Sequence, residues 1–329
     1  MMKKLITDFP EHLREAADLT IENVDSIPHK AVNGLITGMG GSGIGGRLAV
    51  SILSPVCSRP LATLSDYRLP AYVNTSSLVV ASSFSGNTEE TLSAINDALE
   101  RKAKIVALTS GGALKDLAQE NDWAHVLLPV KAASPRAHLG FSLVALMKLL
   151  HHTGFAVKSY DDEFRKSADL LHSQQADIKA SARETAEFLK GALPIIYSGQ
   201  RLLPAATRLR QQINENAKQL AHEAPIPEMN HNELVAWHDK ANLLSATRFL
   251  FIETDYDHQR SRLRREILQT MIPETVKSLR FQAKGESYIQ QLMYFIHWGD
   301  WVSFYLAEQN QVDPFPVNII EDLKKNLLK

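Results

Sequence analysis

The chain has 329 residues, enough for two domains of ordinary size with a hydrophobic core in each. Its 36 basic and 37 acidic side chains nearly cancel and the basic ones form no long run, which argues against nucleic acid as a partner. The amino terminus turns polar before an apolar signal core can form, no apolar run reaches membrane-spanning length, and the single cysteine, Cys57, excludes an intramolecular disulfide. We therefore predict a cytoplasmic protein that does not enter a membrane.

Strands and helices alternate through the first half of the chain. A helical pattern at residues 10–24 precedes five apolar runs, which predict strands at residues 34–37, 61–64, 78–81, 104–109 and 124–128. Helical patterns lie between these runs, and such alternation is typical of a parallel sheet with helices on both faces. The first half therefore predicts a doubly wound α/β domain.

The alternation restarts after a break at residues 153–159, which we take as the domain boundary. A polar helical segment at residues 161–190 comes first. It is followed by predicted strands at residues 193–199, 249–252 and 275–279 and by predicted helices at residues 204–216, 258–271 and 289–306. The two halves look like a structural repeat without repeated sequence. We predict two domains of the same α/β class, residues 1–155 and residues 156–329.

A glycine-rich loop follows the first predicted strand. Gly38, Gly40 and Gly43 satisfy the G-x-G-x-x-G pattern of dinucleotide-binding folds, and Asp66 follows at a plausible distance for a ribose hydroxyl. A dehydrogenase is therefore one alternative. Ser42 adds a hydroxyl to this loop, and a second, serine-rich loop later in the chain would have no role in holding a pyrophosphate.

That second loop lies between the strand at residues 78–81 and a predicted helix. Ser83, Ser85 and Thr88 place three hydroxyls in one strand-to-helix turn, and Gly86 lets the backbone approach a ligand closely. A helix N-terminus with neutral donors suits a phosphate monoester. The alternative is an ordinary helix cap, because Ser, Asn and Thr are the usual capping residues.

A cation marks the start of another predicted helix. Pro135 suits a first helical position, and Arg136 stands in the first turn. A cation there works against the helix dipole and favours an anionic partner, although many surface arginines are only solvated.

These motifs resemble those of a known family. Gly40–Gly43 and Ser83–Thr88 are similar to the phosphate loops of the sugar isomerase (SIS) domain. Further segments resemble the bifunctional phosphoglucose/phosphomannose isomerases: Pro135–Arg136, Asn214–Lys218, Pro227–Glu233, Asp313–Val317 and Leu323–Lys324. The resemblance runs from about Gly34 to the carboxyl terminus.

The resemblance implies an aldose-ketose isomerase that interconverts glucose 6-phosphate and mannose 6-phosphate with fructose 6-phosphate through a cis-enediol, with no metal and no cofactor. Glu215 would move the proton between C2 and C1, His231 would assist ring opening, Arg136 would stabilise the enediolate, and Lys324 would contact the substrate. The phosphate would be held by Gly41, Ser42, Ser83, Ser85 and Thr88.

The family forms homodimers in which the ring-opening histidine reaches into the partner's site, so the resemblance implies a homodimer with His231 in that role. On pattern alone Glu215 is a solvated carboxylate at a helix end, and His231 with His238 is a weak signal for a metal. Lys325 is an alternative to Lys324, and Phe315 stands where relatives often carry a small or hydroxyl residue.

Two further functions remain open. A non-catalytic SIS sensor of phosphosugars would need the phosphate loops but no base, and the sequence shows no attached helix-turn-helix domain. An isomerase of another phosphosugar would keep the base, and Phe315 could narrow the pocket against one of the two hexose phosphates.

Overall fold

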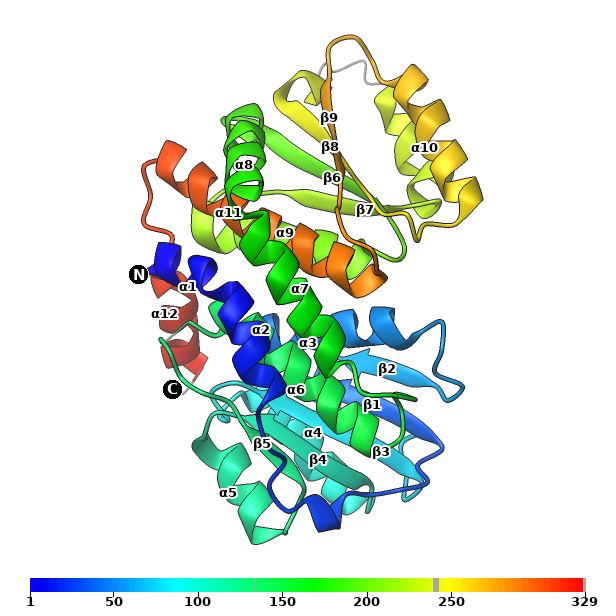
Figure 1. Cartoon of the computed structure of the whole chain (residues 1–329), viewed down its shortest axis with the longest axis vertical. Coiled ribbons are helices and arrows are strands. Elements are labelled where there is room, and N and C mark those ends of the chain that lie inside the picture. Colours follow the sequence, from blue (N-terminus) through cyan, green and yellow to red (C-terminus); the bar gives the residue numbers. More distant parts are fainter. Residues whose placement is uncertain (133, 239–242, 328–329) are drawn as a thin grey trace. The chain divides into compact units, whose positions relative to one another are not determined.

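The computed structural model describes residues 1–132, 134–238 and 243–327. The chain divides into two compact units, residues 7–172 and residues 1–6 with 173–329, named here the amino-terminal and carboxyl-terminal units (Figure 1). The predicted boundary after residue 155 lies before α7, which runs from Asp161 to Ser173 and falls almost entirely in the amino-terminal unit.

The amino-terminal unit is an α/β structure with a five-stranded parallel sheet in the order β2-β1-β3-β4-β5 (Figure 1). Its elements, where η denotes a 3₁₀ helix, are α2 (Phe9–Ala17), η1 (Val24–Ser26), β1 (Asn33–Thr37), α3 (Gly40–Leu53), β2 (Leu61–Leu64), β3 (Ser77–Ser83), α4 (Glu89–Glu100), β4 (Lys104–Thr109), α5 (Gly112–Glu120), β5 (His125–Leu127), η2 (Pro135–His138), α6 (Leu139–His152) and α7 (Asp161–Ser173). All five predicted strands are present, which confirms the predicted fold class.

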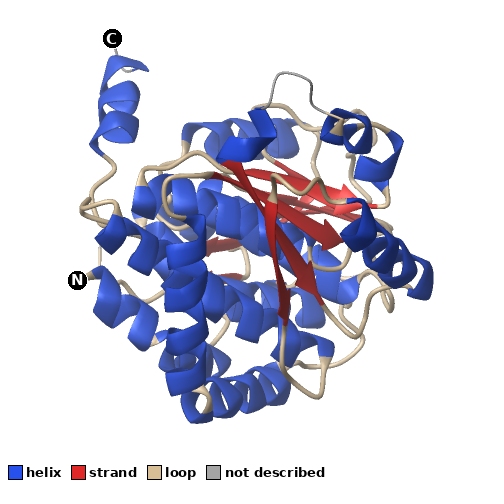
Figure 2. Cartoon of the chain, turned by 90° about the horizontal axis from the view of Figure 1, so that it is seen from above, coloured by secondary structure: helices blue, strands red, loops and turns tan. Residues whose placement is uncertain are grey.

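The central strand explains why this sheet is covered on both faces. All seven residues of β3 are buried, as the continuous apolar run predicts for a parallel strand. On one face Val79 and Ala81 pack with Ile95 of α4 and Leu114 of α5. Helices α3 and α6 contact the sheet as well, and α6 packs against α2. The strands of the amino-terminal sheet therefore lie between helices. In the view of Figure 2, which faces the carboxyl-terminal unit, strands are likewise flanked by helices.

The carboxyl-terminal unit repeats this arrangement with a four-stranded parallel sheet in the order β7-β6-β8-β9. Its elements are α1 (Met2–Thr7), α8 (Gln175–Leu189), β6 (Leu193–Gly199), α9 (Leu203–Ala217), β7 (His222–Ile226), η3 (Glu228–His231), η4 (Glu233–Trp237), η5 (Leu243–Ala246), β8 (Thr247–Glu253), α10 (Gln259–Met271), β9 (Lys277–Gln282), α11 (Tyr288–Gln309) and α12 (Asn318–Leu327).

Three elements differ from the sequence prediction. The helix predicted at residues 10–24 ends at Ala17, and the polar helical segment at residues 161–190 consists of two helices, α7 and α8. Strand β7 was not predicted, because His222 and Glu223 begin it and Pro225 lies within it. Proline lacks the backbone N–H that a ladder needs and is tolerated in β7 because this strand lies at the edge of the sheet.

Helix α11 is the core of the carboxyl-terminal unit. It is buried at every residue from Tyr288 to Ala307 and packs against α8 and α9. Asp300 on this helix accepts hydrogen bonds from Arg208 Nη2 at 2.9 Å and from Gln212 Nε2 at 2.8 Å, both from α9. All three side chains are buried, so the ion pair joins the two helices without help from solvent.

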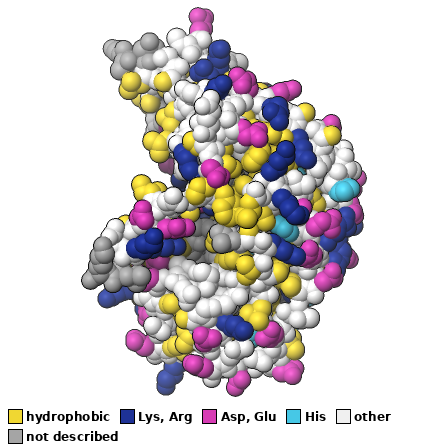
Figure 3. All heavy atoms as spheres, turned by 90° about the vertical axis from the view of Figure 1, so that its left-hand side faces the viewer, with side chains coloured by type: hydrophobic (Ala, Val, Ile, Leu, Met, Phe, Trp, Pro, Cys, Tyr) yellow, Lys and Arg dark blue, Asp and Glu magenta, His cyan; other side chains and the backbone are white. Residues whose placement is uncertain are grey.

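Figure 3 shows one face of the molecule, on which acidic and basic side chains are interspersed. In the part of the chain that the structure describes, no helix combines the length and apolar character needed to span a bilayer.

We expect Asp300→Asn to lower the free energy of unfolding by about 3–5 kcal/mol, because it leaves the Arg208 guanidinium buried without its counter-ion. Asp322→Asn is the matched control, since Asp322 pairs with Lys325 at 3.7 Å on exposed surface and its loss should cost about 0.5 kcal/mol or less. Urea denaturation measures both. Equal midpoints for the two variants would show that the buried pair contributes no more than the exposed one.

Candidate functional site

Three loops meet at the carboxyl edge of the amino-terminal sheet. They follow β1, β3 and β5 and carry Ser42, the serine-rich turn and Arg136 respectively. The hydroxyl of Ser42 accepts a hydrogen bond from the backbone N–H of Phe84 at 3.2 Å, which ties the first loop to the second. The predicted phosphate residues of the two loops therefore lie at one edge, as expected for parallel strands.

Within the serine-rich turn, the hydroxyl groups face one another. Ser83 Oγ lies 2.8 Å from Thr88 Oγ1 and accepts from the backbone N–H of Gly86 at 3.1 Å. Ser85 is exposed, and its hydroxyl accepts from the N–H of Asn87. Thr88 is the N-cap residue of α4, but its side chain makes no capping hydrogen bond. Its hydroxyl serves the turn and not the helix cap.

Gly86 makes this turn possible. Its φ is +71°, and a Cβ there would lie 1.7 Å from the carbonyl oxygen of Gly111. Only glycine accepts both the left-handed backbone and the close approach. The sequence suggested that Gly86 lets the backbone approach a ligand. In the structure, Gly86 lets the backbone approach the neighbouring loop at Gly111.

Arg136 is placed against the glycine-rich loop. A Cβ on Gly41 would lie 3.3 Å from the Cα of Arg136, so the missing side chain lets the two segments touch. Arg136 is 5% exposed, and it belongs to η2 directly before α6. A buried arginine whose backbone lies against the first turn of α3 adds a positive charge at this edge of the sheet, which favours an anion.

His138 fixes the segment that carries Arg136. Its Nδ1 donates to the carbonyl of Ser134 at 2.8 Å, and its Nε2 accepts from the backbone N–H of Lys131 at 3.0 Å. The ring lies 4.6 Å from the ring of Phe84 in the serine-rich turn. Burial lowers the pKa of His138, although the bond to Ser134 acts in the opposite direction. A neutral imidazole with these two partners therefore links two of the three loops.

His12 of α2 forms a cluster of rings with His138 and Phe141. Its ring is parallel to that of His138 at 6.2 Å and lies 4.6 Å from Phe141. Burial and, second, the charge that His138 could carry lower the pKa of His12 to about 4. The cluster is therefore uncharged at neutral pH.

In the carboxyl-terminal unit, Glu215 lies in the last turn of α9 and is half-buried. It lines a cavity of about 380 Å³ whose other walls come from the end of α9 and the start of α12. The lining residues are Asn214, Glu215, Lys218, Pro316, Val317, Asn318, Ile319 and Ile320. The predicted base therefore faces a concave site of a size that suits a small ligand.

Lys218 closes the end of this helix. It has a left-handed φ of +54°, and its ammonium donates to the carbonyl of Glu215 and to that of Pro316, the latter at 2.8 Å. Asn216, between them, is buried and donates to Ser303 Oγ at 2.9 Å. The motif from Asn214 to Lys218 therefore fixes the main chain around Glu215 and ties it to the segment before α12.

His231 ends η3 and is exposed. The next turn is anchored by Glu233, whose carboxylate accepts from Tyr197 Oη at 2.8 Å and lies 3.1 Å from His222 Nε2. Burial acts to raise the pKa of Glu233, but the hydrogen bonds from His222 and Tyr197 outweigh it and lower that pKa. Glu233 thus holds the segment in place while His231 remains accessible.

Lys324 and Lys325 both lie exposed on α12. Lys325 pairs with Asp322 at 3.7 Å, and Lys324 follows Ile320 of the cavity by about one helical turn. Among the described residues, the lining of the cavity includes Pro316 but not Phe315. Phe315 is half-buried, and its N–H donates to Asp313.

The structure therefore brings Gly41, Ser42, Ser83, Ser85, Thr88 and Arg136 to one sheet edge of the amino-terminal unit. Glu215, His231 and Lys324 lie on α9, η3 and α12 of the carboxyl-terminal unit. Among residues 1–132, 134–238 and 243–327, no group of three or more His, Cys, Asp or Glu side chains is arranged to hold a metal ion.

Sequence reasoning missed His138 and Lys218. A histidine two residues after Arg136 was a usable signal, because a buried imidazole often fixes a neighbouring loop. Lys218 belonged to a recognised motif, but its contact with Pro316 spans 98 residues and leaves no trace in local pattern.

Comparison with known proteins gives consistent matches. The model of the bacterial phospho-glucose isomerase C-terminal SIS domain matches residues 178–327. A bifunctional phosphoglucose/phosphomannose isomerase from Caldicellulosiruptor bescii is 34% identical over 99% of this chain and 98% of its own. One from Aquifex aeolicus is also 34% identical, over 93% of this chain and 92% of its own.

The fold has solved counterparts. The structure of tagatose-6-phosphate ketose/aldose isomerase from Escherichia coli matches 95% of this chain and 94% of its own with a TM-score of 0.70 and 14% identity. At this identity the likeness shows a shared fold with paired SIS-type sheets.

We expect the amino-terminal unit to lose stability as the pH falls from about 6.5 to about 4, because the unfolded chain protonates His12 at 6.5 and the folded one only at about 4. The loss should reach at most about 1.4 kcal/mol per pH unit for this one proton. Urea denaturation at several pH values measures it. His12→Gln should remove this component, and His172→Gln, at an exposed position, should retain it. An unchanged pH dependence in His12→Gln would contradict the assignment.

Proposed function

Because this chain belongs to the family of bifunctional phosphoglucose/phosphomannose isomerases, we propose that it interconverts glucose 6-phosphate and mannose 6-phosphate with fructose 6-phosphate. The observation that carries the proposal is the meeting of the serine-rich turn, Ser42 and Arg136 at one sheet edge. Neutral hydroxyls and helix N-termini suit the phosphate, and the guanidinium adds the positive charge that an enediolate needs.

The proposed chemistry moves one carbon-bound proton and one hydroxyl proton. Glu215 takes the proton from C2 of the open-chain aldose, which leaves an enediolate whose negative charge on O1 Arg136 stabilises. The hydroxyl proton of O2 passes to O1, Glu215 returns its proton to C1, and the carbonyl of the ketose forms at C2. His231 transfers the proton that opens the sugar ring, and Lys324 binds the substrate. The positive charge comes from Arg136, so the proposed reaction uses no metal and no cofactor.

Acceptance of both aldoses follows from the same intermediate. Glucose and mannose phosphates differ only in configuration at C2, and C2 is planar in the enediol. A site that binds the enediol therefore serves both sugars, provided that the base can reach C2 from the side on which each proton leaves.

The proposed setting is central carbohydrate metabolism in the cytoplasm, since the reaction joins hexose phosphates on the routes of glycolysis and gluconeogenesis. The single thiol, Cys57, is free, as suits a reducing compartment.

The decisive assay measures fructose 6-phosphate formation from glucose 6-phosphate and from mannose 6-phosphate in the presence of EDTA. We expect activity on both sugars, and a loss of about a hundredfold or more in kcat for Glu215→Gln with phosphosugar binding retained. Glu187→Gln, an exposed carboxylate on α8, is the control and should keep wild-type activity.

Four outcomes would contradict the proposal in different ways. Phosphosugar binding without turnover would indicate a sensor. Turnover of one sugar only would confine the function to that sugar. Full activity in Glu215→Gln would assign the base to another residue, and loss of wild-type activity in EDTA would show that a metal takes part.

We further propose a homodimer in which His231 acts in the partner's site. Support comes from its exposure at the end of η3, on a segment held by Glu233.

Mixing inactive variants tests this arrangement. When Glu215→Gln and His231→Ala chains are unfolded and refolded together, half of the dimers are hybrids with one intact site, so activity should return to about a quarter of the wild-type value. Each variant refolded alone should stay inactive. If His231 acts in its own subunit, or if the protein is monomeric, the mixture will stay inactive as well.

A further inference from the structure

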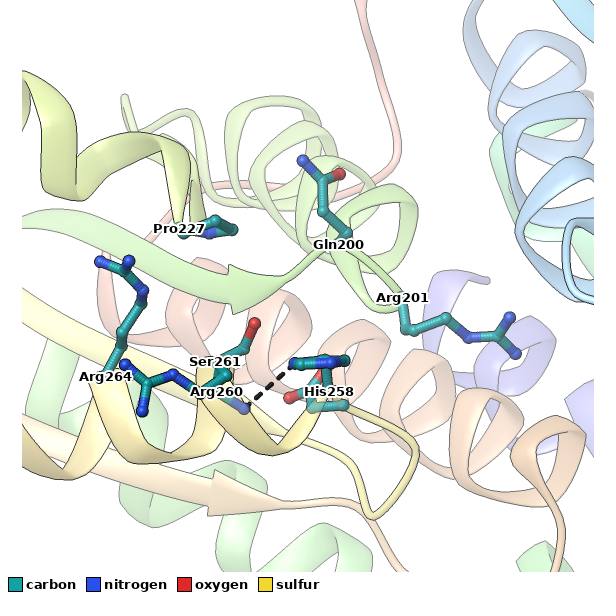
Figure 4. A pocket seen from close by; sticks show the side chains of 8 residues that line it. Gln200, Arg201, Pro227, His258, Arg260, Ser261 and Arg264 are labelled. Carbon is teal, nitrogen blue, oxygen red and sulfur yellow. Dashed lines mark hydrogen bonds between the residues drawn. The ribbon is translucent and has the colours of Figure 1, made fainter.

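The carboxyl-terminal unit has a cavity of about 450 Å³ that the proposed reaction does not use. Arg201, Arg260, Arg264, His258, Ser261 and Asp257 are among its lining residues (Figure 4). They come from the turn after β6, from the loop after β8 and from the first turns of α10.

The cavity occupies the place in its own sheet that the phosphate loops occupy in the other. In both sheets the first strand of the unit is flanked by the second and the third, in the orders β2-β1-β3 and β7-β6-β8. The turn after β6 therefore corresponds to the glycine-rich loop, and the loop after β8 corresponds to the serine-rich turn. Carboxyl ends of parallel strands are where ligands of such folds bind.

The side chains here differ from those of the phosphate loops. Arg260 and Arg264 extend from α10 on one side of the cavity in Figure 4. Arg201 lies on the other side, where its guanidinium stacks on the ring of Tyr288 at 3.9 Å and points away from the other two arginines. The hydroxyl of Ser261 stands between the two sides, and His258 caps the helix by accepting from the N–H of Arg260 at 3.1 Å. The cavity is therefore rich in guanidinium groups at the N-terminus of a 13-residue helix.

Asp257 also lines the cavity and adds a buried carboxylate to a lining that contains Arg260 and Arg264. It is 4% exposed, and its Oδ2 accepts from Arg265 Nη1 at 2.9 Å, which compensates its charge. Its Oδ1 is buried and has no hydrogen-bond partner among the described residues. The carboxylate is fitted against Gly199, where a Cβ would lie 2.1 Å from Oδ1. Oδ1 is therefore enclosed by the protein, and Asp257 acts here by fixing Arg265 and the end of β6 and not as an open acceptor.

We propose that this cavity binds a second phosphate monoester of a polyhydroxyl compound, with the phosphate on Arg260 and Arg264 and the hydroxyl groups toward Ser261 and Gln200. Guanidinium groups are well suited to phosphate, and the volume admits a ligand of hexose-phosphate size. This inference does not depend on the isomerase reaction, because none of these residues has a part in it.

The test is calorimetric titration with glucitol 6-phosphate, which no isomerase can convert. We expect two binding events per chain, one of which weakens about tenfold or more in Arg260→Ser. Arg262→Ser is the matched control, since Arg262 is exposed on the same helix and does not line the cavity. It should leave both events unchanged.

The remaining arms separate the components of the proposal. Inorganic phosphate should occupy the Arg260-sensitive site more weakly than glucitol 6-phosphate does, and Gln200→Ala should reduce this difference. Equal affinity for the two would overturn the role of the polyol. A single binding event that is insensitive to Arg260→Ser would overturn the site itself. A single event sensitive to Arg260→Ser would support this site and count against phosphosugar binding at the serine-rich turn.

Discussion

The absence of a side chain at Gly41 is the constraint on which the amino-terminal site depends. Because Gly41 has no side chain, the glycine-rich segment can lie against the backbone of Arg136, and Arg136 is buried where the two segments meet. The G-x-G-x-x-G pattern suggested a dinucleotide loop, but glycine in this loop meets a neighbouring segment of the same chain. A short glycine motif thus specifies close approach and does not by itself specify the ligand.

The fold was largely predictable because parallel strands are buried on both faces and therefore appear as continuous apolar runs. β3, with every residue buried, was found for this reason. β7 was not, because an edge strand can contain Pro225 and a polar start without penalty. The break between α7 and α8 was also missed, since two helices in sequence share one polar, helical pattern.

The site was predictable in part. Hydroxyls in strand-to-helix turns and a cation at a helix start are local signals, so the serine-rich turn and Arg136 were candidates from pattern alone, beside the alternatives of a helix cap and a solvated arginine. Glu215 and His231 were identified by family resemblance, because a half-buried carboxylate at a helix end looks like any other in sequence. His138 acts through its buried ring against Phe84, and Lys218 acts through a contact with the distant Pro316. Neither contact can be read from the local sequence pattern.

Lys218 holds the end of α9 and the segment before α12 together through main-chain carbonyls, and the cavity of Glu215 has walls from both. A molecule that fills this cavity touches the helix and the tail simultaneously, so its binding free energy also opposes detachment of the tail. Occupancy and resistance of residues 316–320 to proteases are therefore linked by mass action. Protease resistance of residues 316–320 therefore depends on whether the cavity of Glu215 is occupied.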